Sequence, residues 1–263
     1  MQPFYDPDYY DAGWFDAQDN QGAWFDEDWA LLSSPPPDEP YILQSADFAA
    51  GTATDTADIT LPSTPTVGNE LLLAVGYYVP ATIVTPSGWI LIDDYHYNNV
   101  GIALFRRTVV GGDGTVWSLI VTSGSDYLGA AMMEVVGGDL SAVQIANNGT
   151  NGSGTHTTGS LTPSTIPTLP VAFGSQDDAA AVSSDNVTAP GGWTIRERAF
   201  PDYHSLYVIP KDALTSDTST AQSAAITGVD TASDFGSTLI LIPIPSGSGG
   251  VVTGLFLPLM GVG

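Results

Sequence analysis

The sequence predicts an all-β protein, specifically a jelly-roll-like β-sandwich with an extended N-terminal arm and an apolar C-terminal tail. Its 29 Gly and 19 Pro, with abundant Ser, Thr and Val, favour turns and strands over helices. From Tyr41 onward, β-rich runs of strand length are separated by Gly, Pro, Asn and Asp. Short runs at spacings of about ten residues are typical of a sandwich or jelly roll.

Two kinds of run support the strand assignments. Residues 115–122 alternate between apolar and polar, as in a strand with one buried face, whereas residues 71–75 are apolar throughout, as in a strand buried on both faces. The expected strands are residues 41–48, 69–79, 88–93, 99–110, 114–123, 128–137, 168–175, 192–199, 203–210, 219–228 and 235–244.

A weak internal repeat divides the body, residues 41–245, into two pseudo-equivalent halves at about 41–146 and 161–245. Pro86-Ser87-Gly88-Trp89 in the first half resembles Pro190-Gly191-Gly192-Trp193 in the second. Each follows an apolar strand, and each tryptophan is expected to anchor the core behind a turn. The polar segment 147–160 is expected to be a flexible surface loop between the halves.

The first 40 residues form an acidic arm rich in aromatic side chains. They carry ten acids, no base and nine of the 26 aromatics, and a Trp-Phe-Asp motif occurs twice. Ten residues cannot enclose a core, so these aromatics are expected to be buried on a partner or on the chain's own body. A disordered acidic tail is the alternative, although such tails are poor in aromatics. The predicted partner-binding residues are Trp14, Phe15, Asp16, Trp24, Phe25, Asp26 and Trp29.

The arm ends in the proline-rich stretch 33–40, which is expected to be stiff and extended. At the other end of the body, residues 246–250 read as a Gly/Ser linker to an uncharged apolar tail that extends to residue 263. Such a tail is expected to lie in a groove of a partner or of a symmetry mate. The alternative is a last strand of the sandwich. The predicted contact residues of the tail are Leu255, Phe256, Leu257, Leu259 and Met260.

Charge and composition exclude several classes of function. A formal net charge of −24 argues against nucleic-acid binding, which depends on Lys and Arg that neutralise phosphates. The chain has no cysteine, so disulfides and cysteine-ligated metals are excluded. The longest apolar stretch, 251–263, is shorter than the roughly 20 residues that span a bilayer, and the N-terminus does not resemble a signal peptide.

No catalytic motif is present, and we expect no enzyme activity. Two Asp-Tyr-His triplets, 94–96 and 202–204, could bring imidazole and carboxylate from equivalent strands to a metal. Their distances from the preceding tryptophan differ by four residues, so strict equivalence fails, and as strand-end residues they need no function. No metal site or cofactor is assigned, although the many Asp residues suit Ca²⁺. Arg106 and Arg107 are expected to pair with acids; alternatively they engage the acidic arm of a neighbouring copy.

The arm motifs Gly13-Trp14-Phe15-Asp16 and Ala23-Trp24-Phe25-Asp26 are similar to terminal segments of bacteriophage virion proteins. The segments 69–74 and 85–92 resemble β-sandwich modules of phage tail fibres and appendages, and 169–173 with 190–193 resembles the same pattern more loosely. The resemblance implies a location in the virion, other tail, portal-adaptor or capsid proteins as partners, and no catalytic residue. Long triple-helical repeats are missing, which departs from a typical long fibre.

The resemblance leads to two hypotheses, and a third comes from a different class of protein. The first is a tail fibre or appendage, attached by its arm, whose β-sandwich contacts the host surface and any glycan there. The second is a capsid decoration protein that staples capsid subunits together. The third is a secreted carbohydrate-binding β-sandwich. For either virion protein a homotrimer is the expected oligomer.

Overall fold

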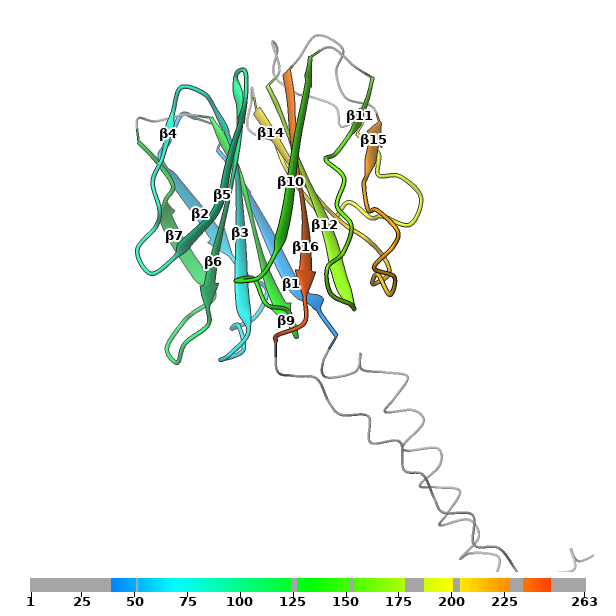
Figure 1. The fold of residues 1–263 in the computed structure, drawn as a ribbon. Coiled ribbons are helices and arrows are strands. Elements are labelled where there is room, and N and C mark those ends of the chain that lie inside the picture. Colours follow the sequence, from blue (N-terminus) through cyan, green and yellow to red (C-terminus); the bar gives the residue numbers. More distant parts are fainter. Residues whose placement is uncertain are drawn as a thin grey trace, which may run out of the picture. The chain divides into compact units, whose positions relative to one another are not determined.

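The computed structural model describes residues 39–50, 52–123, 127–151, 154–177, 187–200, 204–227 and 234–246. Within these ranges the chain forms strands β1 to β16 and no helix, so the predicted all-β sandwich is confirmed at this level (Figure 1). The acidic arm and the apolar tail lie outside the described residues. None of the described residues belongs to a helix long and apolar enough to cross a membrane.

Two five-stranded antiparallel sheets form the body. The first has the order β1 (Tyr41–Ala49), β9 (Leu128–Val136), β3 (Glu70–Tyr78), β6 (Val100–Thr108), β5 (Ile90–Tyr97). The second has the order β10 (Gln144–Asn151), β16 (Asp234–Pro243), β12 (Thr168–Asp177), β14 (His204–Pro210), β13 (Glu197–Ala199).

The two sheets have the same connectivity. Counted along its own half of the chain, each sheet places its strands in the order first, fifth, second, fourth, third. Each half also adds a two-stranded sheet in the same place in the chain, made by one segment after the first strand and one before the fifth. These small sheets are β2 (Thr56–Thr60) with β7 (Val116–Ile120), and β11 (Thr155–Thr157) with β15 (Ala225–Thr227). The first half has a further pair, β4 (Thr82–Ile83) with β8 (Thr122–Ser123).

Three hydrophobic clusters hold the layers together. The central cluster lies between the two large sheets and joins Leu72 and Ile102 of the first to Phe173 and Leu206 of the second. The other two lie between each large sheet and its own small sheet. Strands β3, β9, β12 and β16 therefore bury both faces, which explains why their sequences are apolar without alternation.

The two tryptophan turns have matching geometry. The Trp89 N–H donates to Pro86 O at 3.1 Å, and the Trp193 N–H donates to Pro190 O at 3.1 Å. The glycine before each tryptophan has a positive φ, 80° in one turn and 78° in the other, which disfavours a side chain there. Both tryptophans are buried, as predicted for core anchors.

A glutamine clamp also occurs once in each half. The Gln44 Oε1 accepts from the backbone N–H and the hydroxyl of Ser63 at 2.9 and 3.0 Å. The Gln144 Oε1 accepts the same pair of bonds from Ser164 at 2.8 and 3.1 Å. Gln44 lies on β1 and Gln144 on β10, the first strand of each sheet, so both clamps fasten the loop before the second strand.

The prediction of a flexible loop at residues 147–160 was wrong. Strand β10 covers 144–151 and pairs along its whole length with β16, and β11 covers 155–157 and pairs with β15. Both strands have few buried side chains, so polar residues are tolerated in them. Their sequences therefore lack the apolar pattern from which a strand is predicted. The strands predicted at 192–199 and 219–228 are shorter than expected, at 197–199 and 225–227.

A buried carboxylate ties the loop before β3 to the first sheet. Glu134 is fully buried on β9 and accepts hydrogen bonds from Gln44 Nε2 at 2.5 Å, the Thr66 N–H at 2.8 Å and Asn69 Nδ2 at 2.5 Å. Burial alone would raise the pKa of Glu134, but these bonds together hold it below its ordinary value. The corresponding residue of the second half, opposite Gln144, is Leu241.

We expect Glu134→Leu to destabilise the body by about 1–3 kcal/mol, because three donors lose their buried acceptor. Urea unfolding monitored by circular dichroism measures the change. The exposed Asp58→Asn on β2 serves as the control and is expected to have no measurable effect. Equal stability of the Glu134→Leu variant and the wild-type protein would show that the clamp does not need its carboxylate.

Candidate functional site

Both ends of the body's chain lie together at one pole, which we call the near pole. Here the described chain begins at Glu39 before β1 and leaves after β16. A Cβ on Gly137 would lie 2.6 Å from the Glu39 carbonyl oxygen, and one on Gly138 would lie 2.7 Å from Ile242 Cγ2. The Asp139 N–H donates to Pro243 O at 2.8 Å. The start of β1 and the end of β16 are therefore neighbours, as Figure 1 shows.

The residues predicted to bind partners cannot be placed. Those of the arm, Trp14 to Trp29, and those of the tail, Leu255 to Met260, lie outside the described residues. What the structure does give is the point at which their two segments join the body. That point is the near pole for both.

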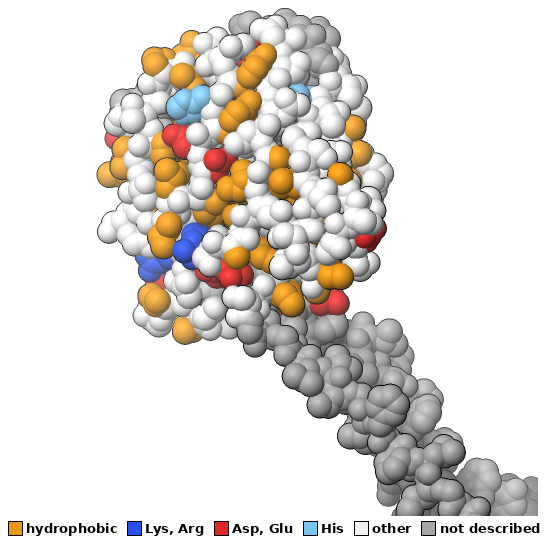
Figure 2. Space-filling view, viewed as in Figure 1, with side chains coloured by type: hydrophobic (Ala, Val, Ile, Leu, Met, Phe, Trp, Pro, Cys, Tyr) orange, Lys and Arg blue, Asp and Glu red, His pale blue; other side chains and the backbone are white. Residues whose placement is uncertain are grey.

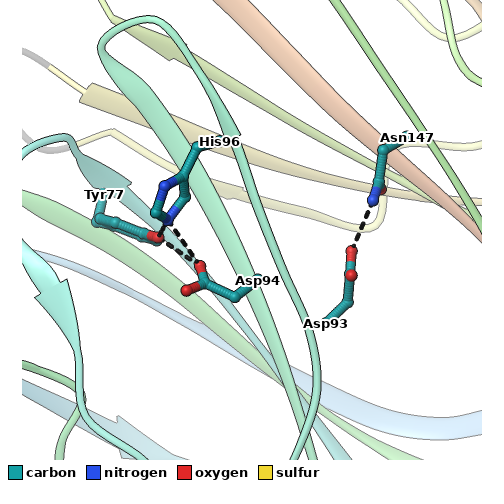
Figure 3. Close-up of polar contacts among 5 residues, drawn as sticks. All are labelled: Tyr77, Asp93, Asp94, His96 and Asn147. Atoms are coloured by element: carbon teal, nitrogen blue, oxygen red, sulfur yellow. Dashed lines mark hydrogen bonds and ion pairs between the residues drawn. The ribbon is translucent and has the colours of Figure 1, made fainter.

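The opposite end, the far pole, carries a polar cluster that we call the tyrosine triad, Tyr77, Asp94 and His96 (Figure 3). The Tyr77 hydroxyl donates to Asp94 Oδ1 and also hydrogen-bonds His96 Nε2. The Asp94 Oδ1 and His96 Nε2 atoms are 3.1 Å apart. Strands β1, β3 and β5 run in the same direction, because each is antiparallel to a shared neighbour, so the last residues of β3 and β5 are far from the near pole.

Glycine on β6 allows the triad to form. Tyr77 pairs with Gly101, and Gly101 pairs with His96, so the three lie in one row across β3, β6 and β5. A Cβ on Gly101 would be 2.2 Å from Tyr77 Cζ, which means that the tyrosine ring covers this glycine and reaches the edge strand. Asp94 and His96 are two residues apart and therefore share a face of β5.

The triad is open to solvent on one side only. Tyr77 is fully buried, while the side chains of Asp94 and His96 are 29% and 48% exposed. Burial, with help from the hydrogen bond to Asp94 and the charges of Asp94 and Asp93, raises the pKa of Tyr77 far above its ordinary value. In Figure 2 a histidine lies on the surface beside acidic side chains, whereas the Lys and Arg side chains on that face lie closer to the near pole. With no ion bound, the phenol is therefore a neutral hydrogen-bond donor to Asp94.

Polar contacts join the two large sheets along both lateral edges. On one edge, Asn147 Nδ2 of β10 donates to Asp93 Oδ2 of β5 at 3.0 Å. On the other, the Ser45 hydroxyl of β1 donates to Glu197 Oε1 of β13, and Arg196 Nε donates to Ser45 Oγ at 2.9 Å. Burial is the main cause that raises the pKa of both Asp93 and Glu197. These contacts link the edge strands of the two sheets.

The two arginines of β6 pair with acids within the body, as predicted. Arg106 Nη1 lies 3.4 Å from Glu70 Oε1, and Arg107 Nη2 lies 2.6 Å from Asp113 Oδ1. The Arg107 guanidinium also lies over Trp117, 5.1 Å from the ring centroid. Both arginines are therefore already neutralised inside the body.

The two Asp-Tyr-His triplets are not structurally equivalent, as their different distances from the preceding tryptophan indicate. Asp94 and His96 lie on β5, the third strand of the first half, but His204 lies on β14, the fourth strand of the second. His204 is buried, and its Nε2 hydrogen-bonds Ser175 Oγ at 2.6 Å. Asp202 and Tyr203 lie outside the described residues. The described residues contain no group of three or more His, Cys, Asp or Glu side chains placed to hold a metal ion.

Sequence reasoning missed Tyr77 because it ends an apolar run and reads as a core residue. Its partners lie 17 and 19 residues away, so their contact depends on the register of β3, β6 and β5. The one available signal was Gly101 near the start of an apolar strand, since an isolated strand glycine often marks a close approach.

Comparison of the chain with protein-family models, curated proteins and solved structures finds no match.

Proposed function

We propose that this chain is a structural component of a phage virion, a tail fibre or appendage protein that is fixed to the particle by its terminal segments. The observation that carries the proposal is the near pole, where Glu39 and Pro243 both contact the Gly137–Asp139 turn. An aromatic arm and an apolar tail thus both continue from one end of the body. This arrangement supports attachment at the near pole and projection of the far pole.

The construction of the body supports the same proposal. We infer that each half is a jelly roll, because each large sheet with its small sheet follows the alternating connectivity of that fold. Two such units share one continuous central core, which gives a rigid body. Rigidity suits a protein that projects a surface, and a homotrimer is the oligomer we propose for it.

Deleting residues 1–32 is expected to leave a folded body that no longer enters phage particles. The deletion stops short of the proline-rich stretch and of β1, so every described strand is retained in the variant. Quantitative mass spectrometry of purified particles measures incorporation, and circular dichroism of the purified variant checks the fold. Incorporation at the wild-type level would contradict anchoring by the arm.

Copy number separates this proposal from a capsid decoration protein. An appendage is present in tens of copies at most, whereas a decoration protein is present in hundreds. The same mass spectrometry, calibrated on the major capsid protein, gives this number. Hundreds of copies per particle would favour a capsid decoration protein, whose near pole would bind neighbouring capsid subunits.

A further inference from the structure

The tyrosine triad has no counterpart in the second half. The two halves can be aligned on their tryptophan turns. In this alignment Gln176 corresponds to Tyr77 and Ser205 to Gly101. Gln176 lies opposite Ser205 in the neighbouring strand, as Tyr77 lies opposite Gly101. Arg198 and Phe200 then correspond to Asp94 and His96. The second half builds the same five-stranded sheet with none of the three triad residues. The triad is thus specific to the first half.

The atoms of the triad are suitable metal ligands. An imidazole nitrogen and a carboxylate oxygen are standard ligands of Zn²⁺, and the phenol adds a third oxygen donor. Two ligand atoms bound at about 2.0–2.2 Å to one tetrahedral ion lie about 3.4 Å apart. The Asp94 Oδ1 and His96 Nε2 atoms, at 3.1 Å, need to separate by only a few tenths of an ångström. Each of the three atoms already hydrogen-bonds the other two, so they converge on one point. The Tyr77 oxygen lies closer to both partners and would have to move away from them further to admit an ion.

We propose that Tyr77, Asp94 and His96 form a site for a divalent transition-metal ion, with Zn²⁺ as the best match. The ion would take the place of the protons that now link the three atoms. Binding of the phenolate would release the Tyr77 hydroxyl proton, and the neutral imidazole of His96 would carry its proton on Nδ1 while Nε2 binds the ion. The exposed side of Asp94 and His96 leaves the remaining coordination positions to water. Asp93, on the same strand, adds negative charge nearby. The site lies at the far pole, on the half of the body that carries the triad.

Calorimetric titration of the full-length protein with ZnCl₂ tests the site, at pH 7.5 with 150 mM NaCl and millimolar Mg²⁺ to suppress diffuse binding to the acidic chain. The expected result is one strong site. His96→Gln, which alters a half-exposed side chain, is expected to abolish it. Tyr77→Phe is expected to weaken it at least about tenfold, since even residues that only position a ligand contribute 10- to 100-fold.

Asp58→Asn is the matched control, because it removes an exposed acid from β2 and is expected to keep wild-type affinity. His96 is the exposed one of the chain's three histidines, so a lone imidazole could bind zinc without the triad. Tyr77→Phe distinguishes binding by the triad, which it weakens, from binding by the His96 imidazole alone, which it leaves unchanged. A thermal melt of each variant checks that the variant is folded. Absence of a strong site in the wild-type protein would overturn the proposal, as would unchanged affinity in Tyr77→Phe.

A second readout covers the case in which Tyr77→Phe is unstable. Co²⁺ in place of Zn²⁺ is expected to give the visible absorption of a tetrahedral site in the wild-type protein, and His96→Gln is expected to lose it. A spectrum of hydrated octahedral Co²⁺ with the wild-type protein would also overturn the proposal.

Discussion

Acidification from pH 7.5 to pH 5 is expected to reduce the free energy of unfolding by about 4 kcal/mol through two buried histidines. Burial lowers the pKa of His204 to about 3 and that of His156 to about 4, whereas an unfolded histidine titrates near 6.5. The native state therefore binds fewer protons than the unfolded chain below pH 6.5. The contribution of the two histidines to the free energy of unfolding is complete above pH 6.5 and is lost as the pH falls. At pH 5 the loss is about 2 kcal/mol per histidine.

Urea unfolding at the two pH values measures this change, and the double variant His156→Gln/His204→Gln isolates its source. Glutamine has an amide that can hydrogen-bond Ser237 and Ser175, which the imidazoles bond at 2.7 and 2.6 Å. Carboxyls with raised pKa values, Asp93 and Glu197, act in the opposite direction, but they are present in both proteins. An equal pH dependence in the double variant and the wild-type protein would contradict the assignment.

Replacing Phe173 with alanine is expected to reduce the free energy of unfolding by about 3–5 kcal/mol. Phe173 is fully buried in the central cluster, where both large sheets contribute side chains. Because this core is shared, the loss is expected to weaken both halves together, and the protein should still unfold in one transition. Ile120→Ala on β7 is the control, since that side chain is 55% exposed.

Hydrogen exchange measured by mass spectrometry follows the two halves separately. In Phe173→Ala, amides of β3 and β6 and amides of β12 and β14 are expected to lose protection by the same factor. Faster exchange confined to β12 and β14 would show that the halves unfold independently and that the central cluster is not a common core.

Much of the fold could be predicted because the strands that bury both faces are apolar runs. Strands β3, β6, β9, β12 and β16 lie close to their predicted ranges for this reason. The repeat was visible in the two tryptophan turns, where backbone geometry demands glycine. Strand β10 could not be predicted, because its polar side chains face outward and its position depends on the backbone of β16.

The triad was less accessible to sequence reasoning than the fold. Asp94 and His96 were singled out together with a second triplet, whose different spacing already argued against an equivalent position, and no third partner was predicted. The actual partner, Tyr77, is determined by strand register and by the space above Gly101, and neither is encoded in a local pattern. Glycines were the available sequence signal for both poles. Gly101 lies against the Tyr77 ring at the far pole, and Gly137 and Gly138 lie against Glu39 and Ile242 at the near pole.

Attachment through the near pole is tested most directly by thiol labelling of intact particles. The chain has no cysteine, so Ser141→Cys near the near pole and Asn99→Cys at the far pole each introduce a single exposed thiol. Compared with the free protein, maleimide is expected to label Asn99→Cys in particles at the same rate and Ser141→Cys much more slowly. Protection of Asn99→Cys with free reaction of Ser141→Cys would contradict attachment at the near pole.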